Sequence, residues 1–360
     1  MNPKENQPRA SIIIIAQNKE AYIDRSIRSL CNQTVQKIEI ICVDDGSTDA
    51  TYERICECAA KDDRIAVIRQ ENCGTLAVRI AGIRKASGAY TMFLDADDIF
   101  LPETVETACD AADEQGADVL EFEFELKENP DNPPAKVKIE FLSDLLSQKR
   151  PLPEPPCGPA LINACFAERV FWWSLVNKTY RTELLQSAVQ YYRGEWLCIG
   201  EDQLIMLMVL SRTQHFARIE KKLYVYYVGG GMTTSSGALT SPDDLKRWGT
   251  KWLALTLARD WLRQSGYPQK EIADAMAAIE SEVRGNAVSM LANGCPADKR
   301  AVYLDWLSQS CTKEEYIDVV SETIQLLDRQ YHSLVDSTCW KLTKPIRRIL
   351  DKVKGTGKES

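Results

Sequence analysis

The chain has 360 residues, of which 44% are hydrophobic and 27% are charged, and this balance is ordinary for a globular protein with a sizeable core. Its formal net charge of -8 argues against general nucleic-acid binding, because that function needs a basic surface. The 12 cysteines include no CxxC pair, so neither a zinc ribbon nor a thioredoxin-like site is indicated. We therefore expect no nucleic-acid partner.

The cysteines and the apolar runs indicate the compartment. Several cysteines stand in apolar segments, as Cys42 does, which is typical of small buried side chains in a reducing compartment. Residues 1–8 are polar and predict no signal peptide, and the longest apolar runs, 12–16 and 204–210, are too short to span a bilayer. We expect a cytoplasmic protein that is soluble or held at the cytoplasmic face of the inner membrane.

The first part of the chain alternates expected strands and helices. Short apolar or β-branched runs predict strands at 11–15, 38–43, 65–69 and 90–94. Helices are expected between them, at 20–31, from about Thr48 or Asp49 onward, and at 75–86. This order predicts an α/β fold with a mostly parallel sheet and helices on both faces, in which ligands bind at the carboxyl ends of the strands.

The pattern changes after residue 118. Acidic and apolar residues alternate over 119–126, which predicts an exposed strand, and a proline-rich irregular stretch follows at 129–159. A helix is expected at 202–211 and a strand at 223–228, followed by a glycine-rich loop. Amphipathic helices are expected over 243–329, and their tryptophans are interpreted as core or interface side chains.

Three acidic motifs carry the chemistry. FLDADD at 93–98 ends a strand with three carboxylates, whose repulsion a divalent cation would relieve, although a solvated acidic turn explains it equally well. VDDGSTD at 43–49 could bind a base or a ribose, or simply form a turn with a helix cap. GEDQLI at 200–205 opens a helix, where its acids are either capping residues or a general base that removes a proton from an attacking hydroxyl.

In their order and spacing, the three motifs resemble those of the inverting family-two glycosyltransferases with a GT-A fold. The resemblance runs from Ser11 to about Gly231 and is far more specific than any single motif. It includes the opening segment 11–34, the helix and strand at 71–98, and NKTYRTELL at 177–185, which resembles the acceptor-side stretch of the family.

The resemblance implies an architecture and an activity. It implies a GT-A catalytic domain at 9–235, a C-terminal helical region at 236–330 and a basic amphipathic tail at 331–360. The implied reaction is metal-dependent, inverting transfer of a sugar from a nucleoside-diphosphate sugar, with UDP the expected nucleotide, to a hydroxyl of a glycan or lipid-linked acceptor. Mn²⁺ or Mg²⁺ is the implied cofactor, and synthesis of a cell-surface polysaccharide or glycoconjugate is the implied process.

The resemblance also implies roles for individual residues. Asp202 would be the catalytic base, and Glu201 would orient the site. The donor and its metal would contact a set of residues at the strand ends: Asp44, Asp45 and Gln17 at the base and ribose, Arg79 near the diphosphate, Asp95 at the ribose and metal, Asp97 at the metal, and Asp98 in support of it.

Some positions depart from the family pattern. Ala16 stands where a proline is usual, Gln17 replaces a tyrosine or threonine, and Ile80 replaces a polar residue after Arg79. The donor contacts are therefore less closely implied than the carboxylates. Two alternatives remain: another class of nucleotide-binding enzyme, which residues 16–20 disfavour because they lack a glycine-rich loop, and a non-catalytic relative that binds a nucleotide sugar as an interaction module.

Two further features have open interpretations. Tyr224, Tyr226 and Tyr227 are either sugar-stacking groups or core residues of a strand, and core packing is favoured for alternate members. Residues 338–360 hold seven basic and two acidic side chains, and apolar residues between Trp340 and Lys354 share one helical face. Such a segment is typical of a helix on an anionic membrane surface or of one that docks on its own protein.

Overall fold

The computed structural model describes residues 7–130, 139–140, 143, 150–154, 157–229, 242–295 and 299–336. The chain forms two compact units, and the described residues change unit between Val283 and Arg284. The domain boundaries expected at 235/236 and 330/331 stay predictions. The tail at 338–360, the loop after residue 229 and much of the proline-rich stretch lie outside the described residues. Within the described ranges, every helix is too short or too polar to cross a membrane.

The first unit is built on a sheet of eight strands within the described residues, in the order β3-β2-β1-β4-β7-β6-β8-β5. Its first half is parallel and consists of β1 (Ala10–Ala16), β2 (Ile38–Asp45), β3 (Ile65–Gln70) and β4 (Tyr90–Asp95). The second half is mixed and consists of β5 (Ile99–Phe100), β6 (Val119–Glu128), β7 (Lys178–Arg181) and β8 (Phe216–Val228). The expected α/β class is thus confirmed.

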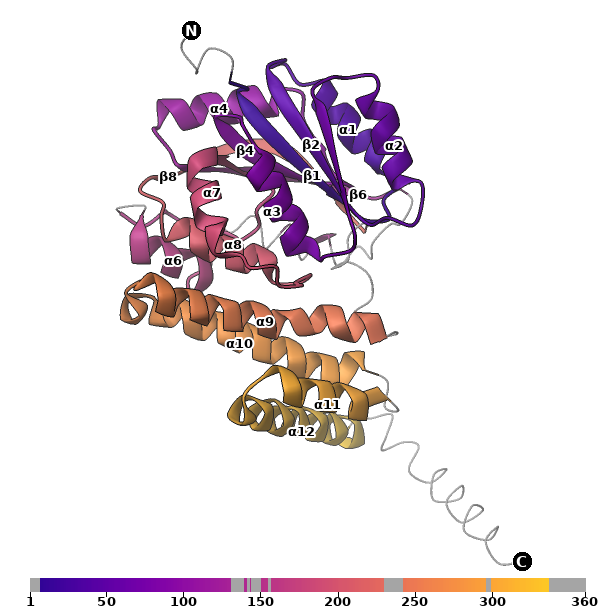
Figure 1. Cartoon of the computed structure of the whole chain (residues 1–360). Coiled ribbons are helices and arrows are strands. Elements are labelled where there is room, and N and C mark those ends of the chain that lie inside the picture. The colour runs from indigo at the N-terminus through magenta and orange to yellow at the C-terminus, as the bar shows by residue number, and fades with distance from the viewer. Residues whose placement is uncertain are drawn as a thin grey trace, which may run out of the picture. The chain divides into compact units, whose positions relative to one another are not determined.

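Helices follow the parallel strands and cover the sheet (Figure 1). They are α1 (Ile23–Cys31), α2 (Thr51–Ala59), α3 (Thr75–Lys85) and α4 (Thr104–Glu114). Ile12, Ile13 and Ile14 are fully buried, because helices pack on both faces of β1. Helix α3 packs closely on β1, since a Cβ atom on Gly82 would lie 2.5 Å from the side chain of Ile13. This contact holds α3 closely against the sheet.

The rest of the first unit adds helices around the mixed half of the sheet. They are α6 (Gly158–Phe166), α7 (Thr182–Ala188), α8 (Glu201–Leu210), α9 (Pro242–Ser265) and the part of α10 (Ala273–Ser289) that precedes residue 284. Trp252 and Trp261 of α9 are buried, which agrees with their interpretation as core side chains. Helix α9 packs on α8, and the compact unit therefore extends past the last motif of the sequence.

The strand expected at 119–126 is present, but the prediction that it is exposed is wrong. Val119, Leu120 and Phe122 are buried, and Glu121 is only 6% exposed, because β6 lies between β7 and β8 within the sheet. Alternation of acidic and apolar residues suggested a solvated face. The acid at 121 is instead buried in a polar network, which that alternation does not reveal.

Glu121 lies between two cations inside the sheet. Its Oε1 is 3.1 Å from the Nζ of Lys178, whose side chain is fully buried, and its Oε2 accepts a hydrogen bond of 2.7 Å from the Nε of Arg218. Lys178 also donates to the carbonyl oxygens of Trp172 and Ser174. The network joins β6, β7 and β8 to the segment that precedes β7.

Glu121→Leu is expected to lower the free energy of unfolding by about 3–5 kcal/mol, because it leaves the Lys178 ammonium buried without its counter-charge. Urea unfolding of the purified protein would measure the change. Glu125→Leu is the matched control: it removes a carboxylate from the same strand, but its ion pair with Lys127 is exposed and is expected to contribute under about 1 kcal/mol. Equal losses from the two variants would contradict a structural role for the buried network.

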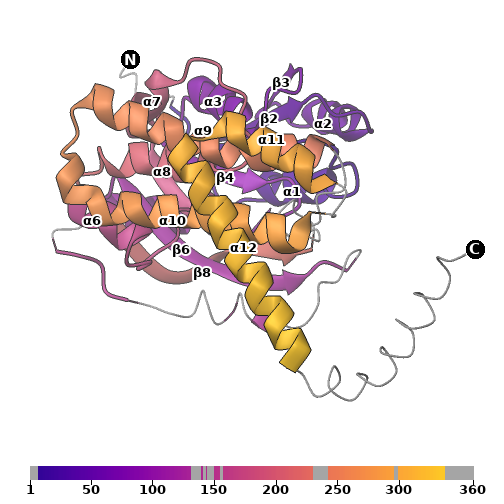
Figure 2. The same cartoon turned by 90° about the horizontal axis from the view of Figure 1, so that it is seen from below.

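The described part of the second unit consists of helices and their connections. Helix α11 (Arg300–Ser310) packs against α12 (Lys313–Asp336), which Figure 2 shows along its length. Leu307 and Val319 are fully buried in this unit, and Arg284 pairs with Glu322 at 3.1 Å. This arrangement agrees with the amphipathic helices expected over 243–329.

Candidate functional site

The three acidic motifs meet at the carboxyl edge of the parallel strands. A cleft of about 480 Å³ opens there, at the ends of β1, β2 and β4 and at the start of α8. Its lining includes Gln17, Asp45, Arg79, Asp95, Asp97, Glu201 and Asp202 from the expected site. Parallel strands end at one edge of a sheet, so motifs that are distant in the sequence converge.

Arg79 of α3 lies at the centre of the acidic side chains. Its Nη2 is 3.2 Å from Oδ1 of Asp202 and 3.6 Å from Oδ1 of Asp95, and its Nε is 3.6 Å from Oε1 of Glu201. The side chain is only 4% exposed. The guanidinium therefore links the strand motif at 93–98 to the helix motif at 200–205.

The carboxylates repel one another despite this cation. Burial, helped by the charges of Asp97 and Asp202, raises the pKa of Asp95 to about 6, although Arg79 and Lys19 oppose the shift. Burial and the neighbouring Asp202 also raise the pKa of Glu201. Such raised values are typical of functional sites, in which unfavourable charges are kept together for binding or catalysis. The cleft is thus prepared for a cationic group or a metal-bound anion.

The acids of the DADD turn divide into those that line the cleft, Asp95 and Asp97, and Asp98, which does not. Asp97 lines the cleft and pairs with Lys19 Nζ at 2.9 Å. Asp98 is 1% exposed, and its two oxygens accept hydrogen bonds from the Tyr224 hydroxyl at 2.7 Å and the Tyr227 backbone N–H at 2.8 Å. Asp98 therefore holds β8 to the turn. Its geometry favours a positioning role over the metal contact implied by the resemblance.

The fit of a divalent metal depends on Asp95 and Asp97. No group of three or more His, Cys, Asp or Glu side chains among the described residues is arranged to hold a metal ion. Mg²⁺ and similar ions, however, are commonly held by one or two carboxylates together with the phosphates of a substrate. Two cleft-lining carboxylates at the end of β4 match that donor set, provided that Lys19 releases Asp97.

The residues expected to contact the nucleoside do not all line the cleft. Asp45 and Gln17 line the cleft, and Asp45 Oδ1 accepts hydrogen bonds from Gln70 Nε2 at 3.1 Å and from the Cys73 backbone N–H at 2.9 Å. Asp44 is fully buried, and its Oδ2 is 3.4 Å from Arg69 Nε. The structure thus brings Asp45 and Gln17 to the cleft and leaves Asp44 behind it.

Several cleft residues carry no sequence motif. Lys251 of α9 and Glu282 of α10 line the cleft, as does Trp173. Their helical pattern alone could not separate a cleft-facing charge from a solvated one. Lys19 could have been found, because it is a basic residue close behind the end of β1. Of the three tyrosines, Tyr224 is buried in the core, whereas Tyr226 and Tyr227 are half-buried and line the cleft.

Helix α9 fixes the start of α8. Gly200 has φ of +100°, and a Cβ atom on it would lie 2.9 Å from Cβ of Ala254. The Thr250 side-chain oxygen accepts hydrogen bonds from the backbone N–H groups of Cys198 and Ile199. At position 200, only glycine suits the positive φ and the close contact with Ala254. Glu201 and Asp202 are therefore positioned by a helix that lies about 50 residues further along the chain.

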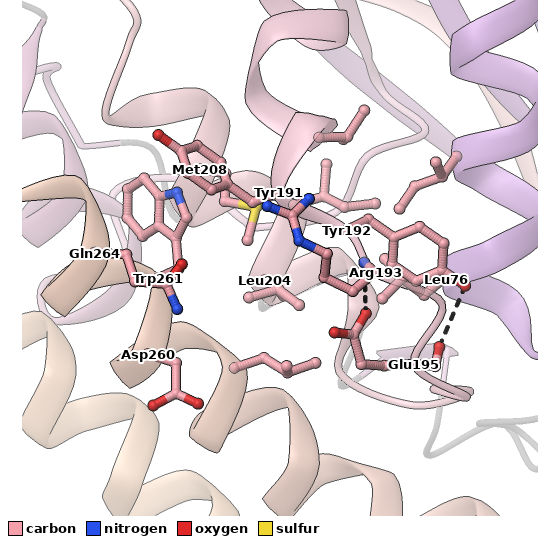
Figure 3. A pocket seen from close by; sticks show the side chains of 14 residues that line it. Leu76, Tyr191, Tyr192, Arg193, Glu195, Leu204, Met208, Asp260, Trp261 and Gln264 are labelled. Atoms are coloured by element: carbon pink, nitrogen blue, oxygen red, sulfur yellow. Dashed lines mark hydrogen bonds between the residues drawn. The ribbon is translucent and has the colours of Figure 1, made fainter.

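A second, smaller pocket is lined by other residues of α8 (Figure 3). It measures about 150 Å³ and is lined mainly by apolar and aromatic side chains, among them Leu204, Met208, Tyr191 and Trp261. None of the acidic side chains of the three motifs lines it. The chemistry of the unit is therefore concentrated in the larger cleft.

Comparisons with known sequences find glycosyltransferases. Residues 11–169 match the sequence model of Glycosyl transferase family 2. The chain is 30% identical over 219 residues to the uncharacterized glycosyltransferase EpsJ of Bacillus subtilis, a match that covers 61% of each chain. It is 39% identical over 111 residues to the glycosyltransferase GlyA of Streptococcus pneumoniae, covering 31% of this chain and 16% of GlyA. The chain thus spans about 61% of the length of EpsJ and much less of GlyA.

Solved structures share the fold at low sequence identity. S. aureus TarS 1–349 in complex with UDP-GlcNAc has a TM-score of 0.60 and 21% identity, covering 90% of this chain and 92% of that one. The mannosyltransferase PcManGT from Pyrobaculum calidifontis, in complex with GDP-Man and Mn²⁺, has a TM-score of 0.52 and 14% identity, covering 96% of this chain and 88% of that one. These likenesses show the fold alone.

Proposed function

We propose that this chain, whose residues 11–169 match the model of Glycosyl transferase family 2 and which has the GT-A fold, transfers a sugar from a nucleoside-diphosphate sugar to an acceptor hydroxyl. The carrying observation is that Arg79 joins the strand-end acid Asp95 to the helix-start acids Glu201 and Asp202 in one cleft. A donor-side group and a base that belong to one reaction must lie this close together.

Asp202 is proposed as the general base. Its Oδ1 lies against Arg79, and 28% of the side chain remains exposed, so the carboxylate is accessible from the cleft. In that role it takes the proton from the acceptor hydroxyl as the hydroxyl oxygen attacks the anomeric carbon, and the nucleoside diphosphate leaves from the opposite face. The transfer would therefore invert the anomeric configuration. Glu201 is more buried and is proposed to orient the site through Arg79.

The donor is proposed to lie along the ends of β1, β2 and β4. Asp45 and Gln17 would contact the nucleoside, and Asp95 and Asp97 would hold a Mn²⁺ or Mg²⁺ ion together with the diphosphate. The ion, when bound, neutralises charge that develops on the departing diphosphate. The UDP-GlcNAc complex of TarS supports UDP as the nucleotide to be tried first. A glycan or lipid-linked acceptor, a cytoplasmic location and a membrane-bound tail stay predictions.

Donor turnover tests the proposal. Purified protein incubated with Mn²⁺ and a panel of UDP-, GDP- and dTDP-sugars is expected to release nucleotide from one donor, and EDTA is expected to stop the release. Asp97→Asn is expected to weaken Mn²⁺-dependent donor binding by about tenfold or more, because a carboxylate ligand becomes a neutral amide. Calorimetry with and without Mn²⁺ would measure this difference.

The control for the metal prediction is Asp24→Asn, which removes a half-exposed carboxylate that pairs with Arg54 and does not line the cleft. It is expected to leave Mn²⁺-dependent binding unchanged. Donor turnover that is insensitive to EDTA would overturn the metal role of Asp97. Absence of both turnover and donor binding across the panel would overturn the proposed activity, whereas donor binding without any turnover would favour the non-catalytic, nucleotide-sugar-binding alternative.

A further inference from the structure

A polar cluster from three helices lies in the cleft and has no part in the donor site described above. It consists of Gln203 of α8, Lys251 of α9 and Glu282 of α10. Glu282 Oε2 accepts a hydrogen bond of 3.1 Å from Gln203 Nε2, and its Oε1 is 3.5 Å from Lys251 Nζ. The side chains of Lys251 and Glu282 are 16% and 21% exposed. A pair so shielded differs from an ordinary surface ion pair, since its groups have lost much of their water.

The cluster lies beside the proposed base. Gly200 directly precedes Glu201, and a Cβ atom on Gly200 would lie 3.7 Å from Cα and 3.8 Å from Cγ of Lys251. Burial lowers the pKa of Lys251, while the charges of Glu282 and Glu201 oppose that shift. Lys251 is therefore at the start of the helix that carries Asp202, within the same cleft. A hydroxyl group activated by Asp202 would belong to a molecule whose other groups reach this cluster.

We propose that Gln203, Lys251 and Glu282 form the acceptor subsite of this protein and that the subsite binds the hydroxyl groups of an uncharged sugar. The proposal rests on the proposed function. An ammonium donates, a carboxylate accepts and an amide does both, and adjacent sugar hydroxyls require a donor and an acceptor side by side. Trp173 lines the same cleft and supplies an apolar surface of the kind that ligand pockets combine with a few polar groups.

The charge of the site selects against an acidic acceptor. A carboxylate or phosphate on the acceptor would approach Glu282 as well as Glu201 and Asp202, and Lys251 is already paired with Glu282. Arg169 also lies 3.9 Å from Glu282, but its side chain is 49% exposed and does not line the cleft. Like charges brought together in a shielded cleft are unfavourable. Neutral hydroxyl groups carry no such cost, and the subsite is therefore expected to prefer neutral sugars over uronic acids.

Lys251→Met and Glu282→Gln test the subsite, and the same two helices offer a matched control. Arg259 of α9 pairs with Glu280 of α10 at 2.8 Å, and neither residue lines the cleft, so Arg259→Met and Glu280→Gln remove an equivalent interhelical pair elsewhere. Saturation-transfer NMR would measure binding of neutral p-nitrophenyl glycosides, and of a p-nitrophenyl glucuronide, to the UDP-loaded proteins. This measurement requires no turnover. For any glycoside that wild type glycosylates, the acceptor KM would be measured as well.

Lys251→Met and Glu282→Gln are each expected to weaken neutral-glycoside binding, or raise the acceptor KM, by about tenfold or more, because each removes a hydrogen bond to a charged group. The affinity for UDP, measured by calorimetry, is expected to be retained, and the control variants are expected to match wild type in both readouts. Retained UDP affinity also shows that the variants are folded.

Three results would overturn the subsite. The first is unchanged glycoside binding in both cluster variants, and the second is an equal loss of glycoside binding in the cluster and control variants. The third is wild-type protein that binds no neutral glycoside, whether or not it binds the glucuronide. These results are distinct from a failure of the proposed function, which the donor screen reports. Donor turnover together with any of the three results would leave the activity in place and remove only the subsite.

Discussion

Asp202→Asn is expected to lower the rate of sugar transfer by about 10²–10⁴-fold while the affinity for UDP is retained. An amide cannot take the proton of the acceptor hydroxyl, and a positioned general base typically contributes a factor of that size. Asn has nearly the same shape, so the side chain can still lie against Arg79, where Oδ1 now stands at 3.2 Å. Initial rates of nucleotide release with a transferable acceptor would give kcat, and calorimetry would give the UDP affinity.

Glu201→Gln is the variant to compare with Asp202→Asn in this experiment. Glu201 is also paired with Arg79, but its side chain is only 10% exposed, and we expect it to orient rather than to react. Its loss is therefore expected to be smaller than that of Asp202→Asn. The reverse order of the two losses would assign the base to Glu201. Equal rates for Asp202→Asn and wild type would remove proton transfer by this carboxylate from the mechanism.

Arg79→Met is expected to lower the free energy of unfolding by about 3–5 kcal/mol, the range typical when one partner of a buried ion pair is removed. Its guanidinium is the cation shared by Asp95, Glu201 and Asp202, and methionine has a similar length without the charge. Urea unfolding would measure the loss. Arg54→Met is the control, because Arg54 pairs with Asp24 at a half-exposed position and is expected to contribute under about 1 kcal/mol.

The loss in Arg79→Met is also expected to depend on pH. Burial raises the pKa of Asp95 to about 6 in the intact protein although Arg79 opposes the shift, and removal of the arginine raises that pKa further. A carboxyl group with a raised pKa in the folded state binds more protons there than in the unfolded chain. Stability therefore falls as pH rises from the pKa of the unfolded carboxyl group to that of the folded one, and in the variant this fall continues above about pH 6, where it has ended in the intact protein. The deficit of the variant is expected to be smaller near pH 5 than near pH 8, and a deficit that is constant with pH would contradict this account.

The parallel half of the fold could be predicted from the sequence because its signals are local. Runs such as Ile12–Ile14 are buried on both faces, and a strand of this kind has no polar period to confuse with a helix. The positions of VDDGSTD and FLDADD directly after such strands predict Asp45, Asp95 and Asp97 at one edge of the sheet, where all three line the cleft.

The mixed half was harder because burial there depends on strand neighbours. The strand expected at 223–228 begins at Phe216, and the strand at 119–126 is buried rather than exposed. Both errors have one origin: residues 216–222 and 119–126 carry charges, and a charged strand looks solvated until its partners are known. Glu121 is buried only because Lys178 and Arg218, about 60 and 100 residues later, come to lie beside it.

The sequence by itself determined the chemical groups of the site, since each acidic motif is a short contiguous segment whose place at a strand or helix end follows from local periodicity. Tertiary structure alone decided how those groups divide. It buried Asp44 and Asp98, placed Arg79 among three carboxylates, and brought Lys251 and Glu282 from α9 and α10 into the cleft. The physical reason is that residue type sets the charge that a side chain can carry, whereas its solvation and its partners depend on the packing of residues far apart in the chain.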